Sequence, residues 1–234
     1  MKEIIPGVYT FSGLTVGRVY LLADEQGLTL IDTGLASAPN KILSQLITAG
    51  YEPTAVKQIL ITHAHPDHIG GLNELVAVTE ADVWASAAET PIIQGESPIP
   101  AVPRERLKGF WKLVPEQKTI FNGVFVTRQL EDQEILPNIL DGLQVIATAG
   151  HSMGHLSFWH PEKRILFCGD VIFNLWGMGL PFNGLTYDMA ENIRSIGRLA
   201  ALEPEIICFG HGGYLTQNTA ARLKQFAQKV GAPT

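Results

Sequence analysis

The first half of the chain alternates short apolar runs with turn-forming residues, a pattern that predicts strands joined by turns. Between two of these runs, Ile42, Leu46 and their apolar neighbours share one stripe at helical spacing, which predicts an amphipathic helix over residues 38–49. A second helix is predicted near residues 72–78. The predicted strands are residues 7–11, 18–22, 28–31, 58–61 and 82–84.

The same two patterns return in the last third of the chain. The strands predicted there are residues 143–147, 156–159, 164–168 and 205–208, and the helices are residues 190–202 and 217–230. Because the strands come in meandering runs with helices between them, we expect an α+β fold with two packed sheets flanked by helices, rather than a strictly alternating parallel sheet.

Residues 89–136 interrupt this regularity, because prolines are frequent there and the apolar spacing is irregular. One amphipathic helix is predicted within them, over residues 104–114. The residues of its apolar face would be Leu107, Phe110, Trp111 and Val114. We interpret the segment as an insertion, or lid, that covers part of a single domain made of residues 1–234.

Composition limits the classes of function. The 234 residues are 46% hydrophobic and 17% charged, enough for one large domain or two small ones. A net charge of −6 without a long block of one sign does not favour a nucleic acid or an anionic membrane as partner. No apolar run has the length of a signal peptide or approaches the ~20 residues of a membrane span, so we expect a cytoplasmic protein. Cys168 and Cys208 are interpreted as buried thiols.

The stretch THAHPDH, residues 62–68, concentrates side chains that bind metals. His63, His65, Asp67 and His68 directly follow a predicted strand. Pro66 cannot donate a hydrogen bond to a strand ladder and is well placed at the start of a helix, so the four side chains lie on a strand-to-helix turn. Imidazole and carboxylate ligands suit zinc, with iron or manganese as alternatives.

Three further candidate ligands lie far along the chain in similar settings. His151, Asp170 and His211 each follow a predicted strand and each is preceded by a glycine. A glycine at the end of a strand lets the backbone approach a site closely, which favours the gathering of ligands. Together with the histidine cluster, these residues predict a metal site built from several strand ends.

These motifs resemble those of the metallo-β-lactamase-fold hydrolases. Asp32-Thr33-Gly34, His63-x-His65-x-Asp67-His68, Gly150-His151, Gly169-Asp170 and Gly210-His211 occur in the order and rough spacing of that superfamily, over residues 32–211. Residues 148–155 and 166–173 are most similar to its glyoxalase-II-like and lactonase-like branches. The resemblance implies a four-layer αββα sandwich with two metal ions, expected to be Zn²⁺, in a groove at the edge of the sheets.

The resemblance also implies a role for each residue of the site. His63, His65 and His151 would hold one metal, and Asp67, His68 and His211 would hold the other. Asp170 would bridge the two metals. Asp32 would orient a ligand, a role that suits a carboxylate. An aspartate at position 170 argues against the β-lactamase branch that uses a cysteine there, and we interpret Cys168 as part of the core.

Three other side chains near these motifs are assigned lesser or looser roles. His155 is expected to support its loop by hydrogen bonding rather than to bind metal. His160, in a charged turn, is expected to be exposed to solvent. Tyr187 is a candidate hydrogen-bond donor to an oxyanion, as a tyrosine is in lactonase-like relatives, although packing of its ring alone would also explain a tyrosine in this turn.

The expected reaction is hydrolysis of an ester, a lactone, a thioester or an amide in a small-molecule substrate. Metals lower the pKa of water towards ~7 and polarise a carbonyl group, so metal-bound hydroxide would attack the carbonyl carbon, and Asp67 would move a proton. Asp67, Asp170 and Tyr187 are therefore the candidate catalytic residues.

The segment between Asp170 and Asp188 indicates the kind of substrate. It contains no charged residue and many large apolar ones, which predicts an apolar groove. An apolar acyl or lactone substrate fits such a groove better than a glutathione thioester. A short segment follows His211, so the C-terminal glutathione-binding domain of true glyoxalase II enzymes is not expected.

Two alternatives remain open at this point. One is an oxidoreductase, similar to the relatives with a single iron that oxidise persulfides. The other is β-lactamase activity on the same fold. The sequence indicates neither the physiological substrate nor the oligomeric state.

Overall fold

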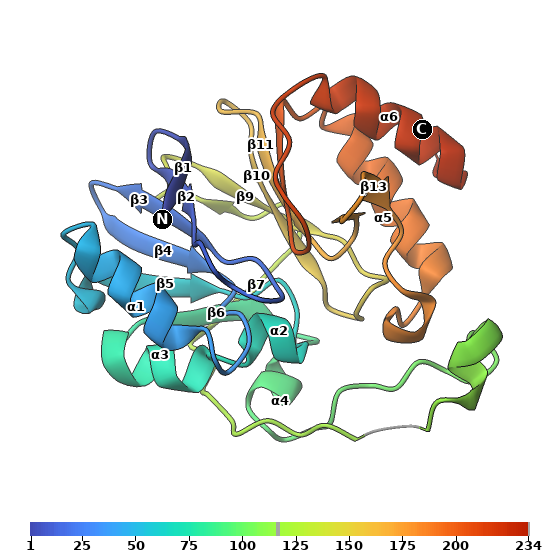
Figure 1. Ribbon diagram of the computed structural model, residues 1–234, viewed down its shortest axis with the longest axis horizontal. Coiled ribbons are helices and arrows are strands. Elements are labelled where there is room, and N and C mark those ends of the chain that lie inside the picture. The colour runs from blue at the N-terminus through green and yellow to red at the C-terminus, as the bar shows by residue number, and fades with distance from the viewer. Residues whose placement is uncertain (116–117, 234) are drawn as a thin grey trace.

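The computed structural model describes residues 1–115 and 118–233. Over these residues, the main strands form a seven-stranded sheet and a five-stranded sheet that face each other (Figure 1). In spatial order, the first sheet contains β1 (Lys2–Ile5), β2 (Val8–Thr10), β3 (Tyr20–Asp24), β4 (Gly27–Ile31), β5 (Val56–Leu60), β6 (Asp82–Ser86) and β7 (Arg128–Leu130). The second contains β14 (Ile206–Phe209), β11 (Ile165–Gly169), β10 (Leu156–His160), β9 (Leu143–Ala147) and β8 (Ile135–Leu136).

Helices cover the outer face of each sheet. The longer helices are α1 (Pro39–Thr48) and α3 (Leu72–Thr79), packed on the first sheet, and α5 (Met189–Ala201) and α6 (Thr219–Val230), packed on the second. The remaining elements are α2 (Pro66–Ile69), α4 (Thr90–Ile93) and the two-stranded β12 (Phe173–Asn174) and β13 (Met178–Gly179). The expected αββα sandwich is therefore confirmed.

The burial of the strands follows from this layering. Every residue of β10 and β11 is buried, because one face of their sheet packs on the first sheet and the other on α5 and α6. Phe158 and Phe167 lie between the sheets, each no more than 1% exposed. Burial of such a side chain contributes roughly 1.5–3 kcal/mol.

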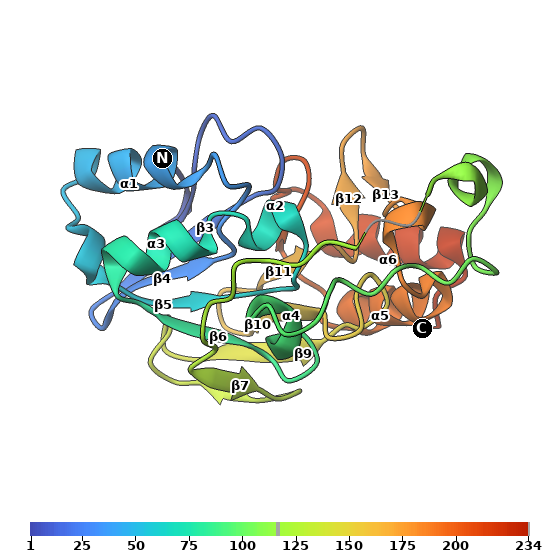
Figure 2. The same cartoon turned by 90° about the horizontal axis from the view of Figure 1, so that it is seen from below.

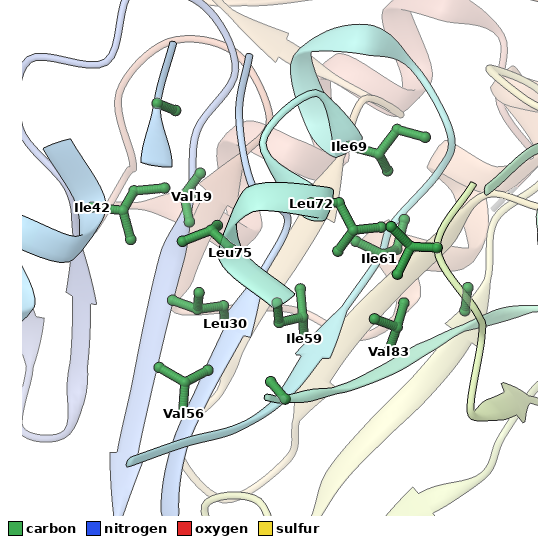
Figure 3. Close-up of a cluster of buried hydrophobic side chains, with 14 of the residues drawn as sticks. Val19, Leu30, Ile42, Val56, Ile59, Ile61, Ile69, Leu72, Leu75 and Val83 are labelled. Atoms are coloured by element: carbon green, nitrogen blue, oxygen red, sulfur yellow. The ribbon is translucent and has the colours of Figure 1, made fainter. Parts of the chain in front are cut away.

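The apolar stripe of α1 packs on the first sheet as its spacing predicts. Ile42 is fully buried and belongs to the same apolar cluster as Leu30, Val56 and Leu75, which Figure 3 shows. Ile47, which was assigned to the same stripe, is 60% exposed and faces solvent. The predicted elements all occur apart from the helix over residues 104–114, with ends shifted by a few residues, whereas β1, β7, β8 and α4 were not predicted.

The segment between α4 and β7 differs from the prediction. It runs as an extended chain along one edge of the molecule towards α5 (Figures 1 and 2). Only a 3₁₀ turn, Gly109–Leu113, forms where an amphipathic helix was predicted, and residues 116–117 lie outside the described residues. Gly109 has a φ of 55°, which no right-handed helix accommodates, and Phe110 is 72% exposed instead of buried. The helix prediction was wrong.

Two further observations concern expectations from composition. Cys168 and Cys208 are free, buried thiols, as expected, and Cys168 belongs to the core between the second sheet and its helices. Burial raises the pKa of both thiols. In the described part of the chain, none of the helices has the length and apolar character to cross a bilayer.

Candidate metal centre

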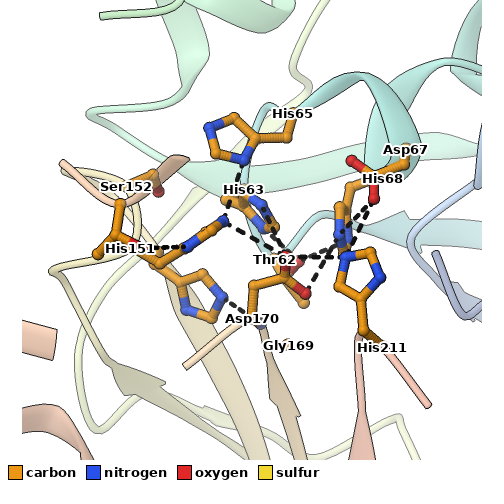
Figure 4. Close-up of polar contacts among 12 residues, drawn as sticks. Thr62, His63, His65, Asp67, His68, His151, Ser152, Gly169, Asp170 and His211 are labelled. Atoms are coloured by element: carbon orange, nitrogen blue, oxygen red, sulfur yellow. Dashed lines mark hydrogen bonds and ion pairs between the residues drawn. The ribbon is translucent and has the colours of Figure 1, made fainter. Parts of the chain in front are cut away.

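Strand direction brings the candidate ligands to one edge of the sandwich. In the first sheet β4 and β5 are parallel, and Asp32 and the THAHPDH stretch follow their C-terminal ends. In the second sheet β9, β11 and β14 run in a common direction, and His151, Asp170 and His211 follow their C-terminal ends. Because the sheets face each other, both groups of side chains reach the same place (Figure 4).

The local conformation of THAHPDH follows from Pro66. His65 is extended, with φ −95° and ψ 156°, as the residue before a proline prefers, and Pro66 begins α2. The chain therefore turns between His65 and Asp67. This turn separates the side chains of the motif into two directions, with His63 and His65 near His151, and Asp67 and His68 near His211 (Figure 4).

One set of candidate ligands consists of His63, His65 and His151. One ring nitrogen from each lies within 4.8 Å of the others, and His151 Nε2 is 3.0 Å from His65 Nδ1. Their rings meet edge to face, with centroids 4.6–4.8 Å apart. Three imidazoles that converge in this way can share one metal ion.

A second set consists of Asp67, His68 and His211. His211 Nε2 is 3.1 Å from Asp67 Oδ2, and His68 Nε2 is 3.8 Å from the same oxygen. Two imidazoles and a carboxylate also suit a divalent metal ion.

Asp170 lies between the two sets. Its Oδ2 is 3.3 Å from His151 Nε2 and 3.1 Å from His211 Nε2, while its Oδ1 is 3.3 Å from His68 Nε2. Gly210 makes room for this carboxylate, because a Cβ there would lie 2.0 Å from Asp170 Oδ1. The structure thus brings together all seven predicted ligands, with Asp170 in contact with both sets.

Three ligand-type atoms of the site have no hydrogen-bond partner among the described residues, and this observation tests whether a metal ion fits the site. His63 Nε2, His68 Nε2 and Asp170 Oδ1 are buried without a hydrogen-bond partner in the described residues. Buried polar atoms in native proteins almost always have a partner. In a metal centre, such atoms have the metal ion as their partner. Because three of them lie together here, the donor set fits divalent metal ions.

Burial keeps three of the histidines neutral. It lowers the pKa of His63, His65 and His151 below the ordinary value, and for His63 the neighbouring imidazoles lower it further. A neutral imidazole offers its lone pair to a metal.

On the side of the site that contains His68 and His211, neighbouring carboxylates and imidazoles shift each other's pKa. Burial alone would raise the pKa of Asp170, but the imidazoles around it hold that pKa well below the ordinary value. In turn, Asp170 and Asp32 raise the pKa of His68 against the effect of burial. Hydrogen bonds to Asp170 and Asp67 likewise raise the pKa of His211 to about 9. The imidazoles and carboxylates on this side of the site therefore stabilise each other's charged forms.

Asp32 contacts His68 as expected for an orienting residue. Its Oδ2 lies 2.7 Å from His68 Nδ1, and its Oδ1 accepts a hydrogen bond from the Thr62 amide at 2.8 Å. Asp32 is 2% exposed and has a φ of 62°, an unfavourable conformation for a residue other than glycine. The hydrogen bonds with Thr62 and His68 hold it there.

Two histidines outside the ligand sets have structural roles. His155 accepts a hydrogen bond from the Asp170 amide at Nε2, 3.0 Å, and contacts Thr148 Oγ1 at Nδ1, 2.9 Å, so it supports its loop as expected. The expectation for His160 was wrong, because it is 2% exposed and donates from Nε2 to the Leu140 carbonyl at 2.6 Å. Its place at the end of β10 turns the ring inwards.

Sequence reasoning missed Glu89. This carboxylate is 2% exposed and accepts hydrogen bonds from the Ala64 amide at 2.9 Å, the Gly154 amide at 2.8 Å and Ser152 Oγ at 2.7 Å. Glu89 therefore links the loop that carries His63 and His65 to the loop that carries His151. No motif or spacing marks it in the sequence.

Two cavities adjoin the site. Residues between Ile92 and Pro115, Thr119 and the loop before α5 help to line the first, of about 400 Å³, with Trp111 and Tyr187 in its wall. The second, of about 390 Å³, is lined by the loop between β2 and β3 and by Phe173, Phe182 and His211. The residues that line both cavities are His65, Asp67, His151 and Leu185. The candidate ligands therefore lie between two largely apolar spaces.

Comparison with known proteins agrees with this geometry. The 28%-identical "Probable metallo-hydrolase YflN" of Bacillus subtilis aligns over 98% of this chain and 93% of its own. The hydroxyacylglutathione hydrolase of Rhodobacter capsulatus is 32% identical over 65% of this chain, which corresponds to 47% of that enzyme.

Solved structures share the fold at low identity. A metallo-β-lactamase family protein of Thermus thermophilus superposes with a TM-score of 0.72 at 23% identity, covering 98% of this chain and 81% of that chain. A metallo-β-lactamase of Cronobacter sakazakii superposes with a TM-score of 0.70 at 23% identity, covering 99% and 98%. Residues 12–211 match the family model of the metallo-β-lactamase superfamily. The chain therefore belongs to the metallo-β-lactamase superfamily and is a metal-dependent hydrolase.

Proposed function

We propose that this protein is a dinuclear zinc hydrolase that cleaves an ester, a lactone or a thioester. One observation carries the proposal. Seven ligand-type side chains form two sets, His63, His65 and His151 on one side and Asp67, His68 and His211 on the other, and Asp170 contacts both. Two zinc ions bound there would lower the pKa of water towards ~7 and polarise a substrate carbonyl.

The residues of the site supply proton transfer and charge. Asp67 lines both cavities, where its carboxylate can accept a proton from the nucleophile and return it to the leaving group. Asp170 holds the two sides together. Tyr187 lines the first cavity beside His65 and His151, and in this proposal its hydroxyl donates to the oxygen of a substrate carbonyl.

The walls of the cavities favour an apolar acyl group. Ile92, Leu107 and Trp111 line the first cavity, and Phe173 and Phe182 line the second. Residues 89–136 act as a lid in this proposal, because their extended part forms one wall of the first cavity. The hydroxyacylglutathione hydrolase relatives support a thioester as one of the candidate substrates.

A hydrolysis screen with metal analysis tests the proposal. Purified protein is assayed on lactones, aryl esters, thioesters and β-lactams, and zinc, iron and manganese are measured on the same sample. We expect two zinc ions per chain and turnover of at least one ester, lactone or thioester, with rates that increase with the apolar size of the acyl group. One iron per chain and persulfide oxidation would instead support the oxidoreductase, and turnover of β-lactams alone would support a β-lactamase.

A further inference from the structure

Arg18, in the loop between β2 and β3, contacts the residues on both sides of His211. Its amide donates to the Gly210 carbonyl at 2.8 Å, and its side-chain Nε donates to the Gly212 carbonyl at 2.9 Å. Two residues later, the Tyr20 hydroxyl donates to the Phe209 carbonyl at 2.7 Å. Arg18 is therefore held beside His211 by its backbone amide on one side and by its guanidinium on the other.

The loop that carries Arg18 is packed closely against the candidate metal centre. A Cβ at Gly17 would lie 2.1 Å from the backbone oxygen of Asp67, and Gly17 has a φ of 72°, so only glycine fits this contact. The Asp67 backbone fixes where the loop passes. Arg18 follows directly and lines the second cavity together with Asp67, Asp170 and His211.

Most donors of the Arg18 guanidinium have no acceptor in the part of the chain that the structure describes. A guanidinium carries five N–H donors in a rigid fork, and here one of them, at Nε, is used by Gly212. Among the described residues no carboxylate forms an ion pair with Arg18, whereas five other arginines are paired in this way. The two terminal nitrogens thus carry no hydrogen bond to the described residues, and Arg18 lines the second cavity.

Charge sets the kind of group that these nitrogens would bind. Arg18 is the one lysine or arginine among the described residues that line the second cavity. Asp67 and Asp170 share the cavity, but in the proposed function the metal ions occupy them. A single planar fork with one positive charge matches a carboxylate, which carries one negative charge and accepts two parallel hydrogen bonds in one plane.

We infer that the substrate carries a carboxylate on the part that occupies the second cavity, and that Arg18 recognises it. The inference rests on the proposed function and adds a specificity-determining residue to it. The apolar part of the substrate then extends into the first cavity, and the scissile bond lies between them at the residues common to both. The substrate class is a carboxylate-bearing ester, lactone or thioester.

Matched esters test this inference on the zinc-loaded full-length protein. The 4-nitrophenyl monoester of glutaric acid carries a carboxylate, and the 4-nitrophenyl ester of glutaramic acid replaces it with a neutral amide of similar size. We expect a higher kcat/KM for the carboxylate ester. Because hydrogen bonds to charged groups contribute roughly 1.5–3 kcal/mol, Arg18→Gln is expected to reduce this preference about tenfold or more, mainly through KM. Arg18→Lys should keep part of the preference for the carboxylate ester, because it keeps the positive charge but not the planar fork.

Arg104→Gln is the matched control. Arg104 lines the first cavity and donates to the Lys112 carbonyl, so the substitution removes a cation from the other side of the site. The preference for the carboxylate ester should persist in this variant. If Arg104→Gln removes the preference and Arg18→Gln does not, the inference is wrong.

Two further outcomes separate this inference from its alternatives. If Arg18 only supports the His211 loop, Arg18→Gln would lower kcat/KM for both esters by the same factor and would also lower the zinc content. That result would overturn the inference. If neither ester is hydrolysed, the proposed function fails on esters. The role of Arg18 is then tested by calorimetry, which measures the binding of glutarate to the zinc-loaded protein. Weaker glutarate binding in Arg18→Gln at equal zinc content supports the inference, and equal binding overturns it.

Discussion

His68 Nδ1 lies 2.7 Å from Asp32 Oδ2, and both side chains are buried. This contact fixes the ring so that Nε2 points towards Asp67 and Asp170. Contacts of this kind orient metal ligands, and their loss typically costs 10–100-fold in metal affinity.

Asp32→Asn is therefore expected to weaken one of the two proposed metal sites, the one that His68 would help to form. We expect a roughly 10–100-fold loss of affinity for the more weakly held metal, measured by competition with a chromophoric chelator. Asp82→Asn, on the exposed start of β6, is the control and should not change the titration. An unaltered titration in Asp32→Asn would show that Asp32 does not orient His68 for metal binding.

Asp170→Ala tests the residue that contacts both ligand sets. Because it removes the carboxylate between them, we expect loss of hydrolysis to the background rate and a fall in bound metal below two ions per chain, measured by elemental analysis. Unfolding in urea checks that the variant folds. An unchanged rate on a confirmed substrate would refute the assignment of the site.

Glu89→Gln is expected to loosen two ligand loops at once. The substitution replaces one carboxylate oxygen of Glu89 with an amide NH₂, so that a donor faces either the Ala64 amide or the Gly154 amide, which is also a donor. We expect a loss of roughly 1–3 kcal/mol in the free energy of unfolding of the metal-free protein, together with weaker zinc binding. Glu74→Gln, on the exposed face of α3, is the control. Equal stability of Glu89→Gln and wild type would contradict this role.

Trp111→Ala tests the proposed lid. Trp111 packs against Gly184, where a Cβ would lie 2.0 Å from the indole, and lines the first cavity. We expect kcat/KM to fall roughly tenfold for esters with long acyl chains and much less for acetyl esters, because ~0.8 kcal/mol is lost for each CH₂ no longer buried. Phe110→Ala removes the neighbouring ring, which is 72% exposed, and should leave chain-length preference unchanged. The same loss in both variants would argue against a lid.

Asp132→Asn tests a pH-dependent contribution to stability away from the site. Burial would raise the pKa of Asp132, but the Ala147 amide and the Arg198 guanidinium lower it below its ordinary value. Because the pKa is lower in the folded state, the ionised carboxylate stabilises the fold at pH values above the unfolded-state pKa of about 3.9. This stabilisation is lost as the pH falls through the folded-state pKa.

The expected size of the Asp132 effect is small. Both partners are more than 40% exposed, so screening by water limits it to below about 1 kcal/mol. Asp132→Asn should therefore lower the urea midpoint slightly at pH 7, and the difference from wild type should shrink as the pH falls below the unfolded-state pKa and through the folded-state value. A difference that grows on acidification would contradict this assignment.

The parts of the fold that were predictable have strong local signals. Apolar runs such as the one ending at Ile61 identify buried strands, and the residue types of THAHPDH together with Pro66 identify a turn with metal ligands. Parallel strand ends then explain why residues as distant as His68 and His211 meet.

The parts that were not predictable depend on tertiary contacts. Glu89 and Arg18 carry no motif, and their roles arise from backbone groups that only folding brings within reach. Residues 104–114 have helical spacing, but the positive φ at Gly109 and the packing of Trp111 on Gly184 override it. His160 was misplaced because its acceptor, the Leu140 carbonyl, is 20 residues away.

The division of the ligands between the two sheets has a thermodynamic consequence. His63, His65, Asp67 and His68 belong to the first sheet, and His151, Asp170 and His211 belong to the second. A metal ion held by both groups would act as a non-covalent cross-link between the halves of the sandwich. Since a ligand at about 100 times its dissociation constant adds about 2.7 kcal/mol to the stability of the folded state, the melting temperature of this protein should follow the free metal concentration around it.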